Sequence, residues 1–106
     1  MRVALRRATG LKAADSNGFS DPYVYLSIPA LGGSKPQRSK TIKKSLDPVW
    51  NAEFEFTGPK RQMGRLLIDV WDEDWGGSHD KLGSASIDLA VLGVLDAALD
   101  DGPMLI

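Results

Sequence analysis

Apolar and polar residues alternate along several short segments of the chain. In WNAEFEF, residues 50–56, the apolar Trp, Ala and Phe residues occupy every second position, and Asn and Glu lie between them. The same period of two is found in RVAL at 2–5, DPYVYLSI at 21–28, SKTIKKS at 39–45, RLLIDVWD at 65–72 and GSASIDL at 83–89, with the weakest pattern in 39–45. A period of two is typical of strands with one buried face, so these six segments are predicted strands.

Turn-forming sequences separate these segments. They are DSNGFSDP at 15–22, GGSKP at 32–36, LDP at 46–48, TGP at 57–59 and WGGS at 75–78. Short strands at this spacing, joined by Gly- and Pro-rich turns, predict an all-β sandwich. LAVLGVLDAAL at 89–99 departs from the pattern because its leucines are spaced for one helical face. It predicts a short helix near the C-terminus, followed by a last strand around PMLI.

Length and composition narrow the class of protein. A chain of 106 residues is long enough for a single domain with a core of its own. The absence of cysteine excludes a disulfide framework, a thiolate metal site and a thiol nucleophile, and fits a reducing compartment. The N-terminus lacks the apolar core of a signal peptide, and no apolar run approaches the ~20 residues of a membrane span. We therefore expect a soluble, cytoplasmic domain.

Acidic residues gather in two of the turns. In WDEDWGGSHD, Asp72 and Asp74 project to the same side of a strand end, and Asp80 follows after a glycine-containing turn. A second pair, Asp15 and Asp21, brackets the turn SNGFS. Two carboxylates about 6 Å apart repel by roughly 3 kcal/mol at an effective dielectric constant of 20. Five converging carboxylates would exceed the stability of a marginal domain unless protons or a cation relieved them.

The chemistry of these residues favours one cation. Carboxylate oxygens on flexible loops suit calcium, which accepts six to eight oxygen ligands, better than the rigid octahedron of magnesium. Zinc would need histidine or thiolate, and His79 is the only such residue in the chain. His79 is interpreted as a solvated neighbour of Asp80.

The acidic turns also allow alternative interpretations, which differ in strength. Each loop taken alone is equally well explained as a solvated acidic turn, because Asp is common in turns. An EF-hand beginning at Asp72 fails because Gly83 stands where a bidentate Glu is required. A catalytic aspartyl pair lacks a companion nucleophile and a substrate pocket.

Three segments, taken in order, point to a known family: ATGLKAADSNGFSDPYVYL, KTIKKSLDPVWNAEFEF and LLIDVWDEDWGGSHDKLG. Together they resemble the calcium-dependent phospholipid-binding C2 domain of protein kinase C and the synaptotagmins, over about residues 2–90. The resemblance implies an eight-stranded antiparallel Greek-key sandwich with its calcium-binding loops at one end. The count of predicted strands is one short of eight. We therefore expect residues 1–106 to be a single C2-like domain that lacks one terminal strand and was excised from a larger protein.

The resemblance also implies a set of metal ligands. The loop carboxylates of the family match Asp15, Asp21, Asp72, Asp74 and Asp80. By the same comparison, the backbone carbonyls of Ala14 and Glu73 are additional ligands. A serine that often assists a third calcium ion falls at Gly77, so we expect two calcium ions.

Membrane-binding residues follow from the same resemblance. The basic strand of the family matches QRSKTIKK, and two aromatic residues stand at loop tips, so the candidate lipid-binding residues are Arg38, Lys40, Lys43, Lys44, Phe19 and Trp75. Phosphatidylserine and phosphoinositides are the anionic lipids expected to bind them. A solvated strand face is an equally good interpretation of the basic residues.

The resemblance implies that this chain is a non-catalytic, calcium-dependent phospholipid-binding module of signalling or membrane trafficking. We expect a monomer that becomes peripheral to the membrane when calcium binds. The alternative is a calcium-independent protein–protein interaction domain on the same fold. A hydrolase is disfavoured because one histidine and no cysteine leave no nucleophile and base pair. Nucleic acid is not an expected partner, since basic and aromatic residues are not interleaved and the net charge is −1.

Overall fold

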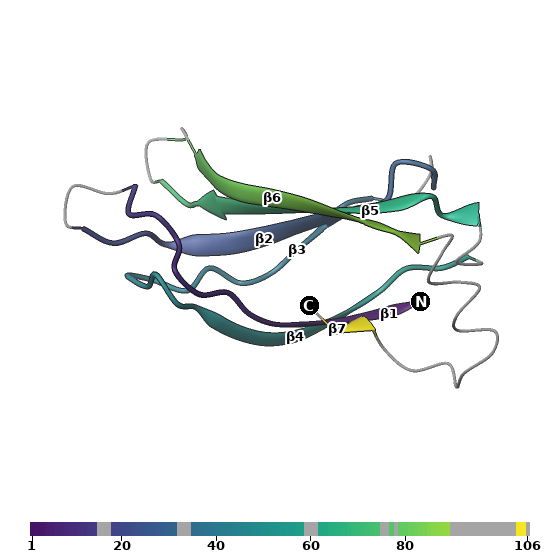
Figure 1. Cartoon of the computed structure of the whole chain (residues 1–106), viewed down its shortest axis with the longest axis horizontal. Helices are drawn as coiled ribbons and strands as arrows, with labels where there is room; N and C mark the ends of the chain where they lie inside the picture. The colour runs from purple at the N-terminus through teal and green to yellow at the C-terminus, as the bar shows by residue number, and fades with distance from the viewer. Residues whose placement is uncertain are drawn as a thin grey trace.

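Two stacked β-sheets form the molecule. The computed structural model describes residues 1–14, 18–31, 35–58, 62–74, 77, 79–89 and 104–105. Its strands are β1 (Arg2–Arg7), β2 (Pro22–Ser27), β3 (Gln37–Arg38), β4 (Val49–Glu55), β5 (Arg65–Asp72), β6 (Asp80–Asp88) and β7 (Met104–Leu105). Strands β4, β1 and β7 make one sheet in that order, and β3, β2, β5 and β6 make the other (Figure 1). The predicted all-β sandwich is confirmed.

Strand pairing among the described residues is antiparallel, except between β1 and β7. β1 pairs with β4 in antiparallel register. In the other sheet, β2 pairs with β3 and with β5, and β5 pairs with β6, also in antiparallel register. β7 pairs with β1 in parallel through Val3↔Met104 and Ala4↔Leu105. The predicted last strand around PMLI is thus present, and only this short pair departs from the antiparallel pattern.

Alternation along the strands builds the core. Leu66 and Ile68 on β5 are buried, and Ile68 lies opposite the buried Leu26 of β2. The buried apolar residues are Val3, Leu5, Tyr23, Val24, Leu26, Ile28, Phe56, Met63, Leu66, Ile68 and Leu89. On β4 the predicted apolar face is partly buried and the Glu residues are exposed. The period-two prediction of which face is buried therefore holds for β4 and β5, whereas on β6 Ala85, which the alternation placed on the core face, is exposed.

One predicted strand has a different structure. The segment 39–45 is not a regular strand; only Gln37–Arg38, at its start, forms β3. The amides of Ser39, Ile42 and Ser45 donate to the carbonyls of Val24, Pro22 and Ser20, at 2.8, 3.0 and 2.8 Å. The segment therefore advances three residues for every two residues along the β2 edge. Such bulging cancels the period-two alternation on which the strand prediction rested.

The next feature is the predicted C-terminal helix. The helix expected over 89–99 lies, apart from Leu89, outside the described residues. The described ranges contain no helical element, and none of their residues form a helix long and apolar enough to cross a bilayer.

Burial predicts how two valines differ in their contribution to stability. Val24 is 1% exposed and Val49 is 51% exposed, and both lie on strands. Val24→Ala should lower the free energy of unfolding by about 2 kcal/mol, because it removes two buried methyl groups and leaves a cavity. Val49→Ala is the matched control, with an expected change within about 0.5 kcal/mol. Urea unfolding measures both, and equal losses for the two variants would contradict this assignment of the core.

Candidate cation site and its flanking surfaces

The two acidic loops meet at one end of the sandwich. The loop between β1 and β2 and the loop between β5 and β6 emerge at the same end (Figure 1). The strand register explains this position, because Pro22 lies opposite Asp72 on one side and Asp80 lies opposite Asp72 on the other. Asp21, Asp72 and Asp80 therefore stand on three neighbouring chain segments at one sheet end.

Asp72 has the most unusual surroundings of these residues. Its side chain lies on the core-facing side of β5 and the residue is 1% exposed. One carboxylate oxygen, Oδ1, accepts a hydrogen bond of 2.7 Å from the Asp21 amide, and the Glu73 amide donates to the Asp21 carbonyl at 2.9 Å. The other oxygen, Oδ2, is buried and has no hydrogen-bond partner in the described part of the chain. A buried carboxylate oxygen without a donor is costly, and a bound cation would satisfy it.

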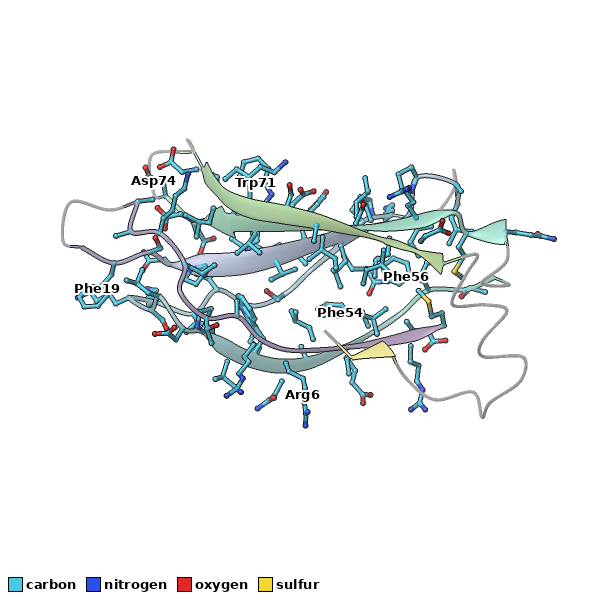
Figure 2. All side chains as sticks on the ribbon, viewed as in Figure 1. Arg6, Phe19, Phe54, Phe56, Trp71 and Asp74 are labelled. Carbon is cyan, nitrogen blue, oxygen red and sulfur yellow. The ribbon has the colours of Figure 1, made fainter. Side chains whose placement is uncertain are left out.

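The other acidic side chains surround Asp72 without converging on it. The Oδ1 atom of Asp21 accepts a hydrogen bond of 2.7 Å from the Lys44 amide. Asp74 is exposed, and its carbonyl accepts from the Gly77 amide at 3.2 Å (Figure 2). Asp80 is exposed at the start of β6. No three His, Asp or Glu side chains within the described ranges are close enough to hold a metal ion.

The remaining predicted ligands are Asp15, Ala14 and Glu73. Asp15 lies outside the described residues. The Ala14 amide donates to the Ser20 hydroxyl at 3.0 Å, and this hydroxyl donates to the Lys12 carbonyl at 2.9 Å. Because Ser20 is fully buried, these bonds fix the base of the first loop and with it the backbone around Ala14.

The carboxylate of Glu73 is turned away from the aspartates. Its Oε1 atom lies 3.4 Å from an Arg38 guanidinium nitrogen, and both side chains are about two-fifths exposed. A hydrogen bond with the Thr41 hydroxyl and the positive charge of Arg38 lower the pKa of Glu73. The side chain of Glu73 is therefore paired with Arg38 and Thr41 rather than with the aspartates.

The acidic side chains at this end carry the oxygen atoms that a hard cation prefers, but three of them do not come together among the described residues. The groups that the structure brings to this end are carboxylate and carbonyl oxygens, and the unsatisfied Asp72 Oδ2 atom is the group that a cation would complete. Calcium tolerates irregular oxygen ligation from loops, whereas transition metals prefer nitrogen or sulfur.

Basic side chains lie beside this end. The segment 39–45 follows the β2 edge toward the loops, and the contact between Lys44 and Asp21 places its last lysine at the acidic end. Lys40, Lys43 and Lys44 are exposed, and in the described part of the chain none of them forms an ion pair. The basic segment is therefore an irregular, exposed edge next to the acidic loops.

An aromatic groove on the outer face of the four-stranded sheet was not foreseen from the sequence. It has a volume of about 240 Å³ and is lined by Tyr23, Tyr25, Trp71 and His79 among the described residues. The Arg38 guanidinium lies 3.8 Å from the centre of the Tyr23 ring, a cation–π contact. The outward positions of β2 and β5 in the alternation could have indicated Tyr25 and Trp71, since they face away from the core.

His79 differs from its predicted role as a solvated neighbour of Asp80. It is half-buried, and its Nδ1 atom is 2.8 Å from the Tyr23 hydroxyl. The two rings pack edge to face, with centroids 5.6 Å apart. The loop before β6 is thereby attached to the outer face of β2.

Of the two loop-tip aromatic residues, only one can be placed. Phe19 is 44% exposed at the end of the molecule that carries the loops (Figure 2). Trp75 lies outside the described residues.

Comparison with known proteins identifies the family. A β-sandwich with acidic loops at one end defines the class, and residues 1–101 match the family described as "C2 domain". The chain is 40% identical over 94 residues to "Protein kinase C, eye isozyme" of Drosophila melanogaster, covering 87% of this chain and 13% of that protein. It is 37% identical over 94 residues to "Tricalbin-3" of Saccharomyces cerevisiae, covering 89% of this chain and 6% of that protein. The chain thus spans only a small part of these relatives.

Solved structures agree with this match. A C2 domain of RIM from Drosophila superposes with a TM-score of 0.73 at 28% identity, covering 84% of this chain and 74% of that one. The calcium-bound pair of C2 domains of Extended-Synaptotagmin 2 gives a TM-score of 0.71 at 31% identity, covering 89% of this chain and 35% of that one. The chain belongs to the C2 domain family, whose members are non-catalytic modules that commonly bind membranes, often with calcium.

The buried Oδ2 atom of Asp72 leads to a prediction about the stability of the domain without calcium. Asp72→Asn keeps the acceptor for the Asp21 amide and removes a buried charge. In chelator we expect it to raise the free energy of unfolding by about 1 kcal/mol, because an unsatisfied buried charged group is costly. The control is Asp69→Asn on the same strand, which loses an ion pair with Lys81 at 3.0 Å and should cost about 0–1 kcal/mol. Urea unfolding compares the two, and a marked loss of stability in Asp72→Asn would show that the carboxylate is structural.

Proposed function

We propose that this C2 domain is a calcium-dependent phospholipid-binding module that attaches to anionic membranes when calcium binds between its acidic loops. The observation that supports the proposal most is the buried Oδ2 atom of Asp72, which has no partner among the described residues. A group that costs stability in the free domain is explained if a cation binds to it.

The proposed ligands come from both loops. In this proposal, two calcium ions are held by five aspartate side chains and two main-chain carbonyls. The aspartates are Asp15, Asp21, Asp72, Asp74 and Asp80, and the carbonyls are those of Ala14 and Glu73. The hydrogen bonds that join Asp21 to Asp72 and to Glu73 support it, because they place the loops in direct contact. The aspartates stand apart in the described structure, so binding draws Asp74 and Asp80 inward from their exposed positions.

Calcium acts in this proposal by changing the charge of one end of the domain. Without it, the aspartates repel anionic lipid; with it, the end is close to neutral and lipid phosphate oxygens complete the coordination shell. Arg38, Lys40, Lys43 and Lys44 then add attraction to phosphatidylserine or phosphoinositide headgroups, worth about 1 kcal/mol for each cation close to the surface. Their position next to the acidic end supports a joint role.

Aromatic residues extend the proposed membrane contact. Phe19, exposed beside the aspartates, and Trp75 enter the headgroup region, where amphipathic rings are favoured. The groove of Tyr23, Tyr25 and Trp71 lies next to Arg38 and offers ring faces to a headgroup on the same side. The domain is then peripheral to the membrane and takes no part in catalysis itself.

Sedimentation with phosphatidylserine-containing vesicles tests this function. The wild-type domain should pellet with the vesicles in calcium and stay in the supernatant in chelator. Asp72→Asn/Asp74→Asn should abolish pelleting in calcium, since the ions that bridge protein and lipid are no longer held. The matched control is Glu53→Gln/Glu55→Gln, which changes the net charge equally on exposed positions of β4 and should behave like wild type.

Three other results would contradict the proposal in different ways. Pelleting that does not depend on calcium would mean that the basic segment 39–45, and not the acidic loops, is mainly responsible for lipid binding. Pelleting of Asp72→Asn/Asp74→Asn in chelator would mean that loss of negative charge is sufficient and that calcium forms no bridge. No pelleting under any condition would favour the calcium-independent protein-interaction domain.

A further inference from the structure

A second group of cations lies on the other sheet, where β1 ends and β4 begins. Arg6 and Arg7 border an open pocket of about 390 Å³, together with Val49 and Asn51 among the described residues. Figure 2 shows Arg6 on the outer side of the three-stranded sheet, away from the four-stranded one. This Arg6–Arg7 pocket is therefore separate from the aromatic groove and from the basic segment 39–45.

The pocket exists because the pairing of the two strands is irregular. Consecutive residues of a regular strand face opposite sides, so neighbouring arginines would not normally border one cavity. Between the pairs Leu5↔Ala52 and Arg7↔Val49, β1 advances two residues and β4 advances three. The extra residue is accommodated with Asn51 at a φ of 47°, a left-handed conformation that asparagine tolerates better than most residues. Bulges of this kind redirect side chains and are common next to binding sites.

Neither arginine is neutralised by the protein. In the described part of the chain, Arg6 and Arg7 have no ion pair and no side-chain hydrogen bond. The Asp47 carboxylate, two positions before Val49, accepts a hydrogen bond of 2.8 Å from the Gly10 amide. Further along β4, Glu53 is paired in register with Ala4 and forms no ion pair with either arginine among the described residues. Two adjacent positive charges therefore border one pocket, and neither is ion-paired in the described part of the chain.

We propose that the Arg6–Arg7 pocket binds a phosphomonoester dianion, without calcium. Each guanidinium presents N–H donors in a fixed fork that matches two phosphate oxygens, and such charge-assisted pairs are strong. A phosphate dianion has enough oxygens for both forks, whereas a single carboxylate satisfies one. The Asn51 amide can add a donor, and the exposed side of Val49 gives the pocket an apolar wall. The group can be free phosphate or the headgroup of a lipid with a terminal phosphate.

Inorganic phosphate is the first probe. It is titrated into the whole 106-residue chain in the presence of chelator and at constant ionic strength, and binding is followed by the NMR shifts of the backbone amides. We expect saturable shifts concentrated at Arg6, Arg7, Val49 and Asn51. Arg6→Gln/Arg7→Gln should weaken binding by more than about tenfold, because it removes two charge-assisted contacts. Arg7→Lys should weaken it to a smaller extent, because the charge remains but the fork is lost.

The control is Arg2→Gln/Arg65→Gln, which removes the same charge from exposed positions at the far end of the strands. It should retain saturable binding at the pocket. Equal binding by Arg6→Gln/Arg7→Gln and this control, or shifts that rise linearly without saturation, would overturn the proposal. A dispersed spectrum will show that each variant is folded, which separates a loss of binding from a loss of structure.

Vesicles that contain phosphatidic acid separate the two sources of phosphate. Pelleting in chelator that is lost in Arg6→Gln/Arg7→Gln but kept in the control identifies a lipid headgroup as the ligand. Saturable binding of inorganic phosphate without such pelleting identifies a soluble phosphate. Since chelator is present throughout, failure of this proposal leaves the calcium-dependent function untouched.

Discussion

A hydrogen bond of 2.7 Å from the Asp21 amide to the Asp72 carboxylate joins two loops that are 51 residues apart in sequence. It fixes one oxygen of a side chain that the strand alternation has already turned toward the interior. The second oxygen is then held in a buried position without a donor among the described residues. Such an arrangement raises the free energy of the domain unless something positive binds there. The proposed cation site, the electrostatic change at this end and the link to anionic lipid all depend on this side chain.

Acidic and basic side chains lie next to each other at this end of the sandwich. The acidic loops are bordered by exposed lysines on the β2 edge, and Glu73 and Arg38 connect the two regions through their side chains. Surface ion pairs of this kind contribute little stability, so their main effect here is to hold the basic segment beside the loops. If calcium neutralises the aspartates as proposed, the lysines dominate the local field within about 10 Å at ordinary salt. The Arg6–Arg7 pocket is on the opposite sheet, and the phosphate binding proposed there does not depend on calcium.

Much of the fold was predictable because burial follows a period of two. The core-facing residues of β1, β2, β4 and β5 followed from alternation alone, and the acidic loops were recognisable from the spacing of their aspartates. The bulged segment 39–45 was mispredicted because its three-for-two pairing with β2 is set by tertiary hydrogen bonds. The aromatic groove and the Arg6–Arg7 pocket depend on which strands are neighbours and on an irregular register. Neither property is encoded in a local pattern.

Carbon-detected NMR of the aspartate carboxyl groups, with and without calcium, tests whether Asp72 binds the ion. The side-chain carboxyl signal of Asp72 should shift as calcium is added and reach a plateau, while that of Asp69, paired with Lys81, should stay in place. Both carboxylates are on β5, so a general change in the strand would move both signals. An Asp72 signal that does not respond to calcium, in a domain that is otherwise folded, would contradict the account.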